Sequence, residues 1–297
     1  MPQSSAEPRP SGLPFALGAH LIWGLMPLYL REVRAVPLFE FIGWRAILTL
    51  PFALLFIAIR RQGGELRAAL TDPLILRRLA ASSLFVGCNW LIYVMAIQSG
   101  HVLAASFGYY VTPLLQVGVG ALFLHERLSL RQWSAVVLAA LGVLVIGWGQ
   151  ASMLWLSMGM ALTWLCYGLV RKITPVGALP GLAVETLLLS PVALAVMGWY
   201  AFSPAGLSLG QSRWLDLMIL CAGPMTAVPL TFFAIAARRL DFSVLGMLQF
   251  VSPTIVFFLG LWVFGQPLDP LQLVAFALIW TAIAVFVWDL LAQRRTA

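Results

Sequence analysis

Long apolar runs alternate with short polar connectors along almost the whole chain. Ten runs reach the roughly 17 to 25 residues needed to cross a bilayer, at about 13–30, 38–59, 79–98, 103–124, 132–149, 153–170, 180–200, 215–236, 242–264 and 271–290. Backbone N–H and C=O groups find no water in lipid, so runs of this length are predicted to be helices. The pattern therefore predicts an all-α polytopic membrane protein with ten transmembrane helices.

The second half of the chain repeats the first. Matches 140 or 141 residues apart join the halves: Gly18 with Gly159, Trp23 with Trp164, Tyr110 with Phe250, Pro113 with Pro253, and Gly120 with Gly260. Five spans per half, an odd number, make the second copy enter the membrane from the opposite face. We expect a disordered tail at 1–12, a five-helix repeat at 13–149, a second, inverted five-helix repeat at 153–290, and a tail at 291–297. In transporters built from such repeats the substrate site lies at the repeat interface.

Composition and charge narrow the class of protein further. With 61% hydrophobic and 10% charged residues, the chain lacks the polar surface of a soluble domain of its size. Its net charge of +7 comes from basic residues scattered between apolar runs, which does not favour nucleic-acid binding. With a cytoplasmic N-terminus, 14 of the 18 basic residues fall on the cytoplasmic side, which predicts that both termini are cytoplasmic.

Several ordered motifs resemble one known family. The run from Ala19 to Tyr29 resembles the opening A-x-x-x-W-G-x-x-P-x-Y of the RarD-type branch of the EamA family, in the drug/metabolite transporter superfamily. Further matches are Asn89 to Tyr93, Gly100 to Val102, Ser106 to Tyr110, Pro113 to Leu115, Glu126 to Leu128, Tyr167 to Lys172, Glu185 to Leu187, and Pro253 with Thr254. One departure is Gln266, where the pattern has Glu.

The resemblance covers about residues 13–290. It implies ten helices in two inverted repeats around a central cavity, and alternating access that exports amino acids or related small metabolites. It also implies a multi-pass protein of the bacterial inner membrane.

The candidate substrate residues are aromatic and polar side chains within the spans. Trp23 and Trp164 lie halfway along matched spans, where no headgroup is available to an interfacial tryptophan. The other candidates are His20, Asn89, Tyr93, Tyr109, Tyr110, Thr163, Tyr167 and Gln249. Rings with a few amides and hydroxyls suit a zwitterion with a variable side chain. Packing tryptophans, and a helix-to-helix hydrogen bond for Asn89, are the structural alternatives.

Prolines and charges within the spans are further candidates. Pro27, Pro113 and Pro253 are expected to kink their helices as gates, or else as static bends. Arg45 needs a partner or a water path inside the membrane, and the nearest carboxylate in sequence is Glu40. For Glu185, an interfacial anchor or a structural ion pair is favoured over a proton relay.

Two other functions compete with amino-acid export. Efflux of hydrophobic drugs or nucleotide-like metabolites would use the same rings. An intramembrane enzyme is disfavoured, because the sequence has no His-Glu-x-x-His pair and no paired mid-span aspartates. We expect no enzymatic activity, cofactor or metal, and as partners only a small-molecule substrate and the lipid bilayer. The chain is expected to be a monomer or a homodimer, since Ala135, Ala139 and Gly142 suit close helix packing.

Overall fold

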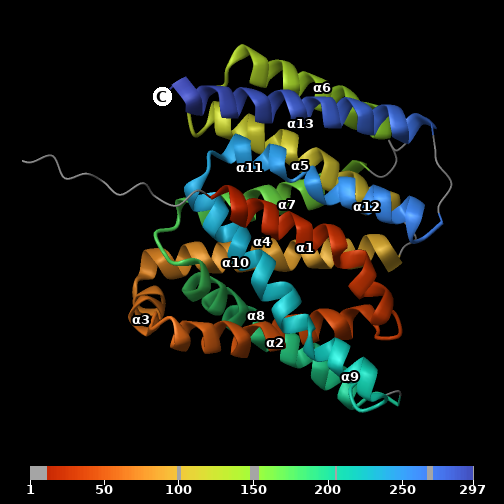
Figure 1. Ribbon diagram of the computed structural model, residues 1–297. Helices are drawn as coiled ribbons and strands as arrows, with labels where there is room; N and C mark the ends of the chain where they lie inside the picture. Colours follow the sequence, from red (N-terminus) through yellow and green to blue (C-terminus); the bar gives the residue numbers. More distant parts are fainter. Residues whose placement is uncertain (1–11, 99–101, 148–153, 205, 266–269, 297) are drawn as a thin grey trace, which may run out of the picture.

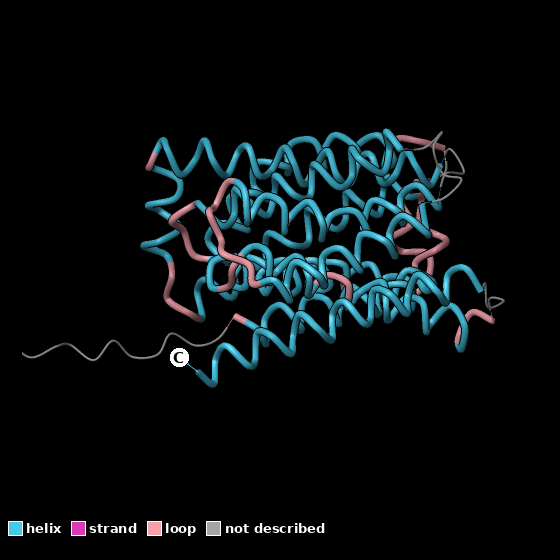
Figure 2. The backbone as a smooth tube through the Cα atoms, turned by 90° about the horizontal axis from the view of Figure 1, so that it is seen from above, coloured by secondary structure: helices cyan, strands magenta, loops and turns pink. Residues whose placement is uncertain are grey.

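The computed structural model describes residues 12–98, 102–147, 154–204, 206–265 and 270–296, and every regular element among them is a helix (Figure 1). The helices are α1 (Leu13–Glu32), α2 (Leu38–Ile59), α3 (Gly63–Thr71), α4 (Pro73–Gln98), α5 (Val102–Leu122), α6 (Leu130–Gly147), α7 (Leu154–Ile173), α8 (Ala178–Ala201), α9 (Arg213–Leu220), α10 (Ala222–Arg239), α11 (Phe242–Leu248), α12 (Val251–Trp262) and α13 (Pro270–Thr296). Seen from above, most of them run along one direction, with most connectors at the two ends (Figure 2).

Eight helical segments of the described chain are long and apolar enough to cross a membrane. They are α1, α2, α4, α6, α8, α9 with α10, α11 with α12, and α13. The helices α5 and α7 are not among the eight, although they have 21 and 20 residues. The described part of the chain therefore has the helices and the composition of a multi-pass membrane protein.

Two segments that were not expected to be helical are helical, whereas α4 starts where the sequence predicts a cap. The run Thr71-Asp72-Pro73 predicts a cap with proline opening the next helix, and α4 does begin at Pro73, where the Asp72 carboxylate accepts hydrogen bonds from Leu74 N at 2.8 Å and Ile75 N at 3.0 Å. A short amphipathic helix, α3, forms where the sequence predicted only a connector. The segment 291–297, expected to be a tail, is helical as far as Thr296.

Two of the crossing segments are interrupted by proline. Pro224 follows the break between α9 and α10 at Cys221, and Pro253 follows the break at Gln249 and Phe250 between α11 and α12. Proline has no N–H to donate to the carbonyl four residues earlier. The Gln249 carbonyl accepts from Ser252 N at 3.2 Å instead, which is a tighter turn. Helices α1 and α5 continue through Pro27 and Pro113.

Two pairs of helices form the two opposite edges of the structure, and each pair joins one helix to its counterpart in the other half. Helices α6 and α13 pack along one edge and α2 and α8 along the opposite edge, with α1, α4, α5, α7 and α10 between them (Figure 1). On the first edge Ala135 and Ala139 are fully buried, and a Cβ at Gly142 would lie 2.8 Å from the Ala275 carbonyl oxygen. The small residues of α6 therefore pack against α13 of the same chain.

Contacts between the halves follow the repeat. Helix α1 packs against α10 and α12, and its counterpart α7 packs against α4 and α5. In the repeat, α10 corresponds to α4 and α12 corresponds to α5, so these two sets of contacts are equivalent. The largest hydrophobic core extends through these central helices and contains Trp164, Tyr167 and Phe233.

Candidate functional site

An aromatic cluster joins the two halves in the middle of the helices. The Trp23 ring of α1 lies 5.3 Å from Trp164 of α7, edge to face, and 5.8 Å from Phe233 of α10. The Trp164 ring lies 5.2 Å from Phe233 and 5.3 Å from Tyr167. Each such ring pair contributes about 0.5 to 1.5 kcal/mol beyond the area it buries. The two repeat-related tryptophans thus meet directly, together with Phe233.

His20 extends this cluster towards α12. Its ring lies 5.4 Å from Trp23, and its Nδ1 is 3.2 Å from the Ser252 hydroxyl oxygen. That hydroxyl also donates to the His20 carbonyl at 2.9 Å. His20 Nε2 is buried without a hydrogen-bond partner among the described residues. Since Ser252 directly precedes Pro253, His20 ties α1 to the interrupted segment.

Asn89 on α4 binds α7. Its Nδ2 donates to the Met160 carbonyl at 2.9 Å and to the Thr163 hydroxyl at 3.0 Å. This is the helix-to-helix hydrogen bond that the sequence offered as an alternative to substrate contact. One turn further along α4, Tyr93 packs against Leu156 and Met160 of α7. The polar face of α4 is therefore fixed against the first helix of the second half.

Gln249 occupies the break between α11 and α12. Its Nε2 donates to the side-chain carbonyl of Gln116 on α5. Beside it, a Cβ at Gly246 would lie 2.8 Å from the Pro113 carbonyl oxygen, so the backbones of the two repeat-related segments approach closely. The Tyr110 ring lies 5.9 Å from Phe276 of α13. The neighbouring Tyr109 interacts electrostatically with Arg45 and Tyr93.

The charges of α2 have different partners. Glu40 is fully buried and accepts hydrogen bonds from Ser208 N and Ser208 Oγ, both at 2.8 Å, and from Trp44 Nε1 at 3.0 Å. Arg45 instead donates from Nε to the Thr226 hydroxyl of α10 at 3.0 Å. Its guanidinium carbon lies 5.0 Å from the centre of the Trp90 ring. Glu40 is thus not the partner of Arg45.

Tyr109 and Arg45 share an unusual environment. The two side chains, with Tyr93, are close enough to interact electrostatically, and both lie deep among protein atoms. Tyr109 nevertheless has 42% of its surface accessible, and Arg45 is partly exposed. A side chain that is surrounded by protein and still accessible borders open space between helices. Arg45, Tyr93 and Tyr109 share this property, and so does Tyr110.

Glu185 of α8 forms a buried ion pair. Its Oε1 lies 3.5 Å from Arg171 Nη1 of α7, and the two side chains are 2% and 1% exposed. The same oxygen accepts a hydrogen bond from Ser82 Oγ at 2.5 Å, and the carboxylate also bonds Tyr167. Tyr167 therefore connects the aromatic cluster to the ion pair near the end of α7.

Glu126 links the halves at the end where α5 finishes and α11 starts. Its carboxylate accepts from Phe242 N at 2.5 Å, Ser243 N at 2.9 Å and Ser243 Oγ at 2.7 Å, and lies 4.0 Å from Lys172 Nζ. Sequence reasoning quoted Glu126 only as part of a motif. A carboxylate just after an apolar run was the available signal, but its partner lies 116 residues away. Its repeat counterpart, Gln266, lies outside the described residues.

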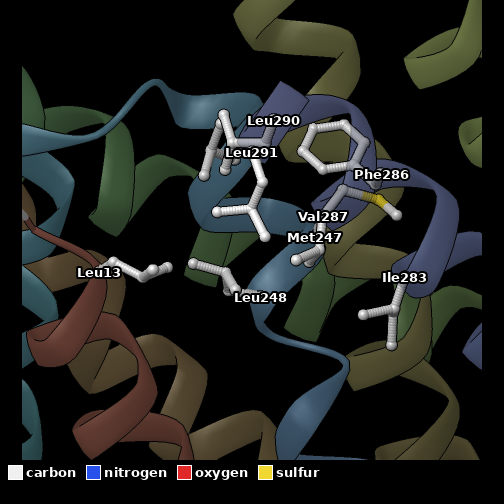
Figure 3. A pocket seen from close by; sticks show the side chains of 9 residues that line it. Leu13, Met247, Leu248, Ile283, Phe286, Val287, Leu290 and Leu291 are labelled. Atoms are coloured by element: carbon white, nitrogen blue, oxygen red, sulfur yellow. The ribbon is translucent and has the colours of Figure 1, made fainter. Parts of the chain in front are cut away.

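Two hollows on the periphery contain none of the sequence candidates. The pocket in Figure 3 lies between the start of α1, α11 and α13, and apolar side chains such as Leu13, Leu248 and Phe286 line it. An open groove beside α12 and α13 is lined by Leu21, Ile255 and Trp280 among others. Neither offers a charged group, so both suit hydrocarbon rather than a polar solute.

Comparisons with known proteins identify the family of the chain. Residues 10–148 match the EamA-like transporter family. An uncharacterized transporter of Pseudomonas aeruginosa is 43% identical over 94% of this chain and 93% of its own length. Protein RarD of Escherichia coli is 38% identical over 96% and 97%. A second Pseudomonas aeruginosa protein, called chloramphenicol-sensitive protein RarD, is 29% identical over 94% of both chains.

The fold has a counterpart among solved structures. A crystal structure of a protein 21% identical in sequence covers 95% of this chain and 98% of its own, with a TM-score of 0.75. At that identity the likeness concerns the fold alone. The family match and the full-length relatives show that the chain belongs to the EamA-like transporter family, in its RarD branch.

Proposed function

We propose that this protein is a secondary transporter of the bacterial inner membrane that exports amino acids, with aromatic and apolar ones favoured, and related small metabolites. The observation that carries the proposal is the aromatic cluster of Trp23, Trp164, Tyr167 and Phe233, contributed by both halves near mid-span. Aromatic rings give apolar contact that tolerates several side-chain shapes. Arg45, which bonds Thr226 two turns before Phe233 on α10, and Tyr109 offer polar groups that suit the charged end of such a solute.

The proposed topology is ten spans in two inverted five-helix repeats, 13–149 and 153–290, with both termini cytoplasmic. Support comes from the exchange of helix contacts between halves, in which α1 with α10 and α12 corresponds to α7 with α4 and α5. Helix α1 also begins at the end of the bundle where α13 finishes (Figures 1 and 2). The basic residues predict that this end is cytoplasmic.

The proposed mechanism is alternating access, and this conformation is closed towards the cytoplasm. Glu126 holds the start of α11, and Lys172 Nζ donates to the Leu240 carbonyl at 2.6 Å at the same end. Accessible surface is instead found at Tyr109, seven residues into α5 from its opposite end. Export then requires release of the cytoplasmic contacts, with bending at the break before Pro253, so that solute reaches the cluster from inside.

Efflux of hydrophobic drugs is the second candidate, because a relative carries the name chloramphenicol-sensitive protein and rings of this kind accept apolar drugs. Amino-acid export is preferred since Arg45 and the Tyr109 hydroxyl would contribute nothing to a neutral apolar drug. In neither case is an enzymatic step or a cofactor needed, and we propose a monomer or homodimer.

The test is uptake of labelled phenylalanine into liposomes containing the purified protein, with and without a pH gradient. Unlabelled amino acids and chloramphenicol serve as competitors. We expect saturable uptake that amino acids suppress and that does not require the gradient, because neither Glu40 nor Glu185 is free to carry a proton along the site. Uptake equal to that of empty liposomes, in folded protein, would reject amino-acid export.

A further inference from the structure

Arg45 is held in a fixed orientation, and among the described residues only its Nε makes a hydrogen bond. Nε donates to Thr226 Oγ1 of α10 at 3.0 Å, and Trp90 of α4 lies beside the group at 5.0 Å. A cation at this distance from an indole ring is attracted to the ring face. With Nε engaged by Thr226, the edge formed by Nη1 and Nη2 is the one left for a further acceptor. That edge matches a carboxylate, which two parallel N–H donors can bind at once.

Arg45 has no carboxylate partner within the described part of the protein. None of the ion pairs found there includes it. Glu40 is engaged with Ser208, Glu185 with Arg171, and Glu126 with the start of α11. The groups that interact electrostatically with Arg45 are the phenols of Tyr29, Tyr93 and Tyr109, which are neutral at physiological pH. A cation within a membrane span costs roughly 3 kcal/mol and is ordinarily paired.

The guanidinium and the aromatic cluster share one face of α10. Thr226, which orients Arg45, lies seven residues before Phe233, and two helical turns separate them by about 10 Å along the axis. A solute with a carboxylate at Arg45 would therefore place its apolar body towards Phe233 and the tryptophans. The carboxylates of α2 and α8, Glu40 and Glu185, have other partners, so neither is available to an ammonium group at this place.

We propose that Arg45 binds the carboxylate of the transported solute, and that the site requires this carboxylate together with an apolar body but requires no ammonium group. This inference rests on the proposed transport function and specifies its substrate class. Amino acids satisfy it, and so do aromatic carboxylic acids that lack the amine. Neutral or cationic derivatives of the same molecules do not.

The experiment is competition against uptake of labelled phenylalanine in liposomes. The competitors are 3-phenylpropionate, which lacks the amine, phenylalaninamide, which lacks the carboxylate, and phenyl phosphate. We expect 3-phenylpropionate to compete within about threefold of phenylalanine, and the amide to be at least about tenfold weaker, as for loss of a charge-assisted hydrogen bond. An amide that competes as well as the acid overturns the proposal. Stronger competition by phenyl phosphate overturns it in favour of a phosphate site.

Variants separate Arg45 from other causes of this preference. Arg45→Gln should reduce the preference for acid over amide to within about twofold, and Arg45→Lys should keep part of it. The matched control is Arg31→Gln, because Arg31 is half exposed and pairs with its neighbour Glu32. If Arg45→Gln keeps the full preference, another residue recognises the carboxylate and the proposal is wrong.

Failure of the transport hypothesis can be told apart from failure of this inference. If the folded protein takes up no phenylalanine, the proposed function fails, and Arg45 is tested by thermal unfolding with each compound. Stabilisation by 3-phenylpropionate that is absent with the amide and lost in Arg45→Gln supports a carboxylate site. Equal effects of acid and amide, or none with either, overturn it.

Discussion

Removal of the Glu185 charge should be among the most destabilising single changes in this protein. The variant Glu185→Gln keeps a hydrogen-bond acceptor for Ser82 but leaves the Arg171 guanidinium without its counter-charge. Arg171 is 1% exposed, and its Nε and Nη1 have no hydrogen-bond partner in the described part of the chain, while Nη2 donates to the Ala178 carbonyl at 3.1 Å. Water therefore cannot replace the lost carboxylate.

The expected magnitude follows from the separation of the two charges. At 3.5 Å, and with an effective dielectric constant of about 20, the attraction amounts to roughly 5 kcal/mol. Breaking a buried pair by removal of one partner costs about 3 to 5 kcal/mol. At roughly 3 °C per kcal/mol for a chain of comparable size, the apparent unfolding temperature should fall on the order of 10 °C. Thermal unfolding in detergent, followed by tryptophan fluorescence, measures this shift.

Two controls make the prediction specific to the ion pair. Glu32→Gln removes one partner of the exposed pair Arg31 with Glu32, for which about 0 to 1 kcal/mol is expected. The double variant Arg171→Met with Glu185→Leu removes both charges and should recover most of the lost stability. Equal small shifts in Glu185→Gln and Glu32→Gln would refute the reasoning, as would a double variant no more stable than Glu185→Gln.

Two further changes test the contacts between the halves. Glu126→Ala removes three hydrogen bonds at the start of α11, so opening at this end of the helices should become at least about tenfold more frequent. The opening rate is measured as the rate at which a thiol reagent modifies a cysteine placed at buried Val244, in a background without native cysteines. Glu65→Ala, at an exposed position of α3, is the control. Equal modification rates in the Glu126→Ala and Glu65→Ala backgrounds would contradict the prediction. Gly24→Ala should cost about 1 to 3 kcal/mol, because its Cβ would lie 2.7 Å from Ile255 Cδ1. Gly118→Ala, where nothing lies within 4 Å, should show no such loss in thermal unfolding, and equal losses would refute the packing argument.

The crossing segments were largely predictable because lipid imposes a single requirement on each of them, a long apolar helix. Segment 38–59 matches α2 residue for residue. The short α3 was missed, since it lies in polar sequence, where local amphipathicity decides the structure. The breaks at Cys221 and Gln249 depend on which hydrogen bonds replace those lost to Pro224 and Pro253, and hydropathy does not contain that information.

The candidate site was predictable only where the repeat provided a second copy. Trp23 and Trp164 were paired by their spacing of 141 residues, and their rings are in contact. The partners of polar residues were not predictable, because they lie far away in sequence: Thr226 is 181 residues from Arg45, and Ser208 is 168 from Glu40. A spacing of five residues argued against Glu40 as the partner of Arg45, and Glu40 does bond Ser208 and Trp44 instead.

The most direct test of a transport site between the two halves compares two tryptophans of α7. Trp164 is 8% exposed within the aromatic cluster, whereas Trp155 is 65% exposed on the same helix. In liposomes with equal amounts of folded protein, Trp164→Ala should reduce saturable phenylalanine uptake at least about tenfold, and Trp155→Ala should leave it unchanged. Unchanged uptake in Trp164→Ala would contradict a substrate site at this cluster.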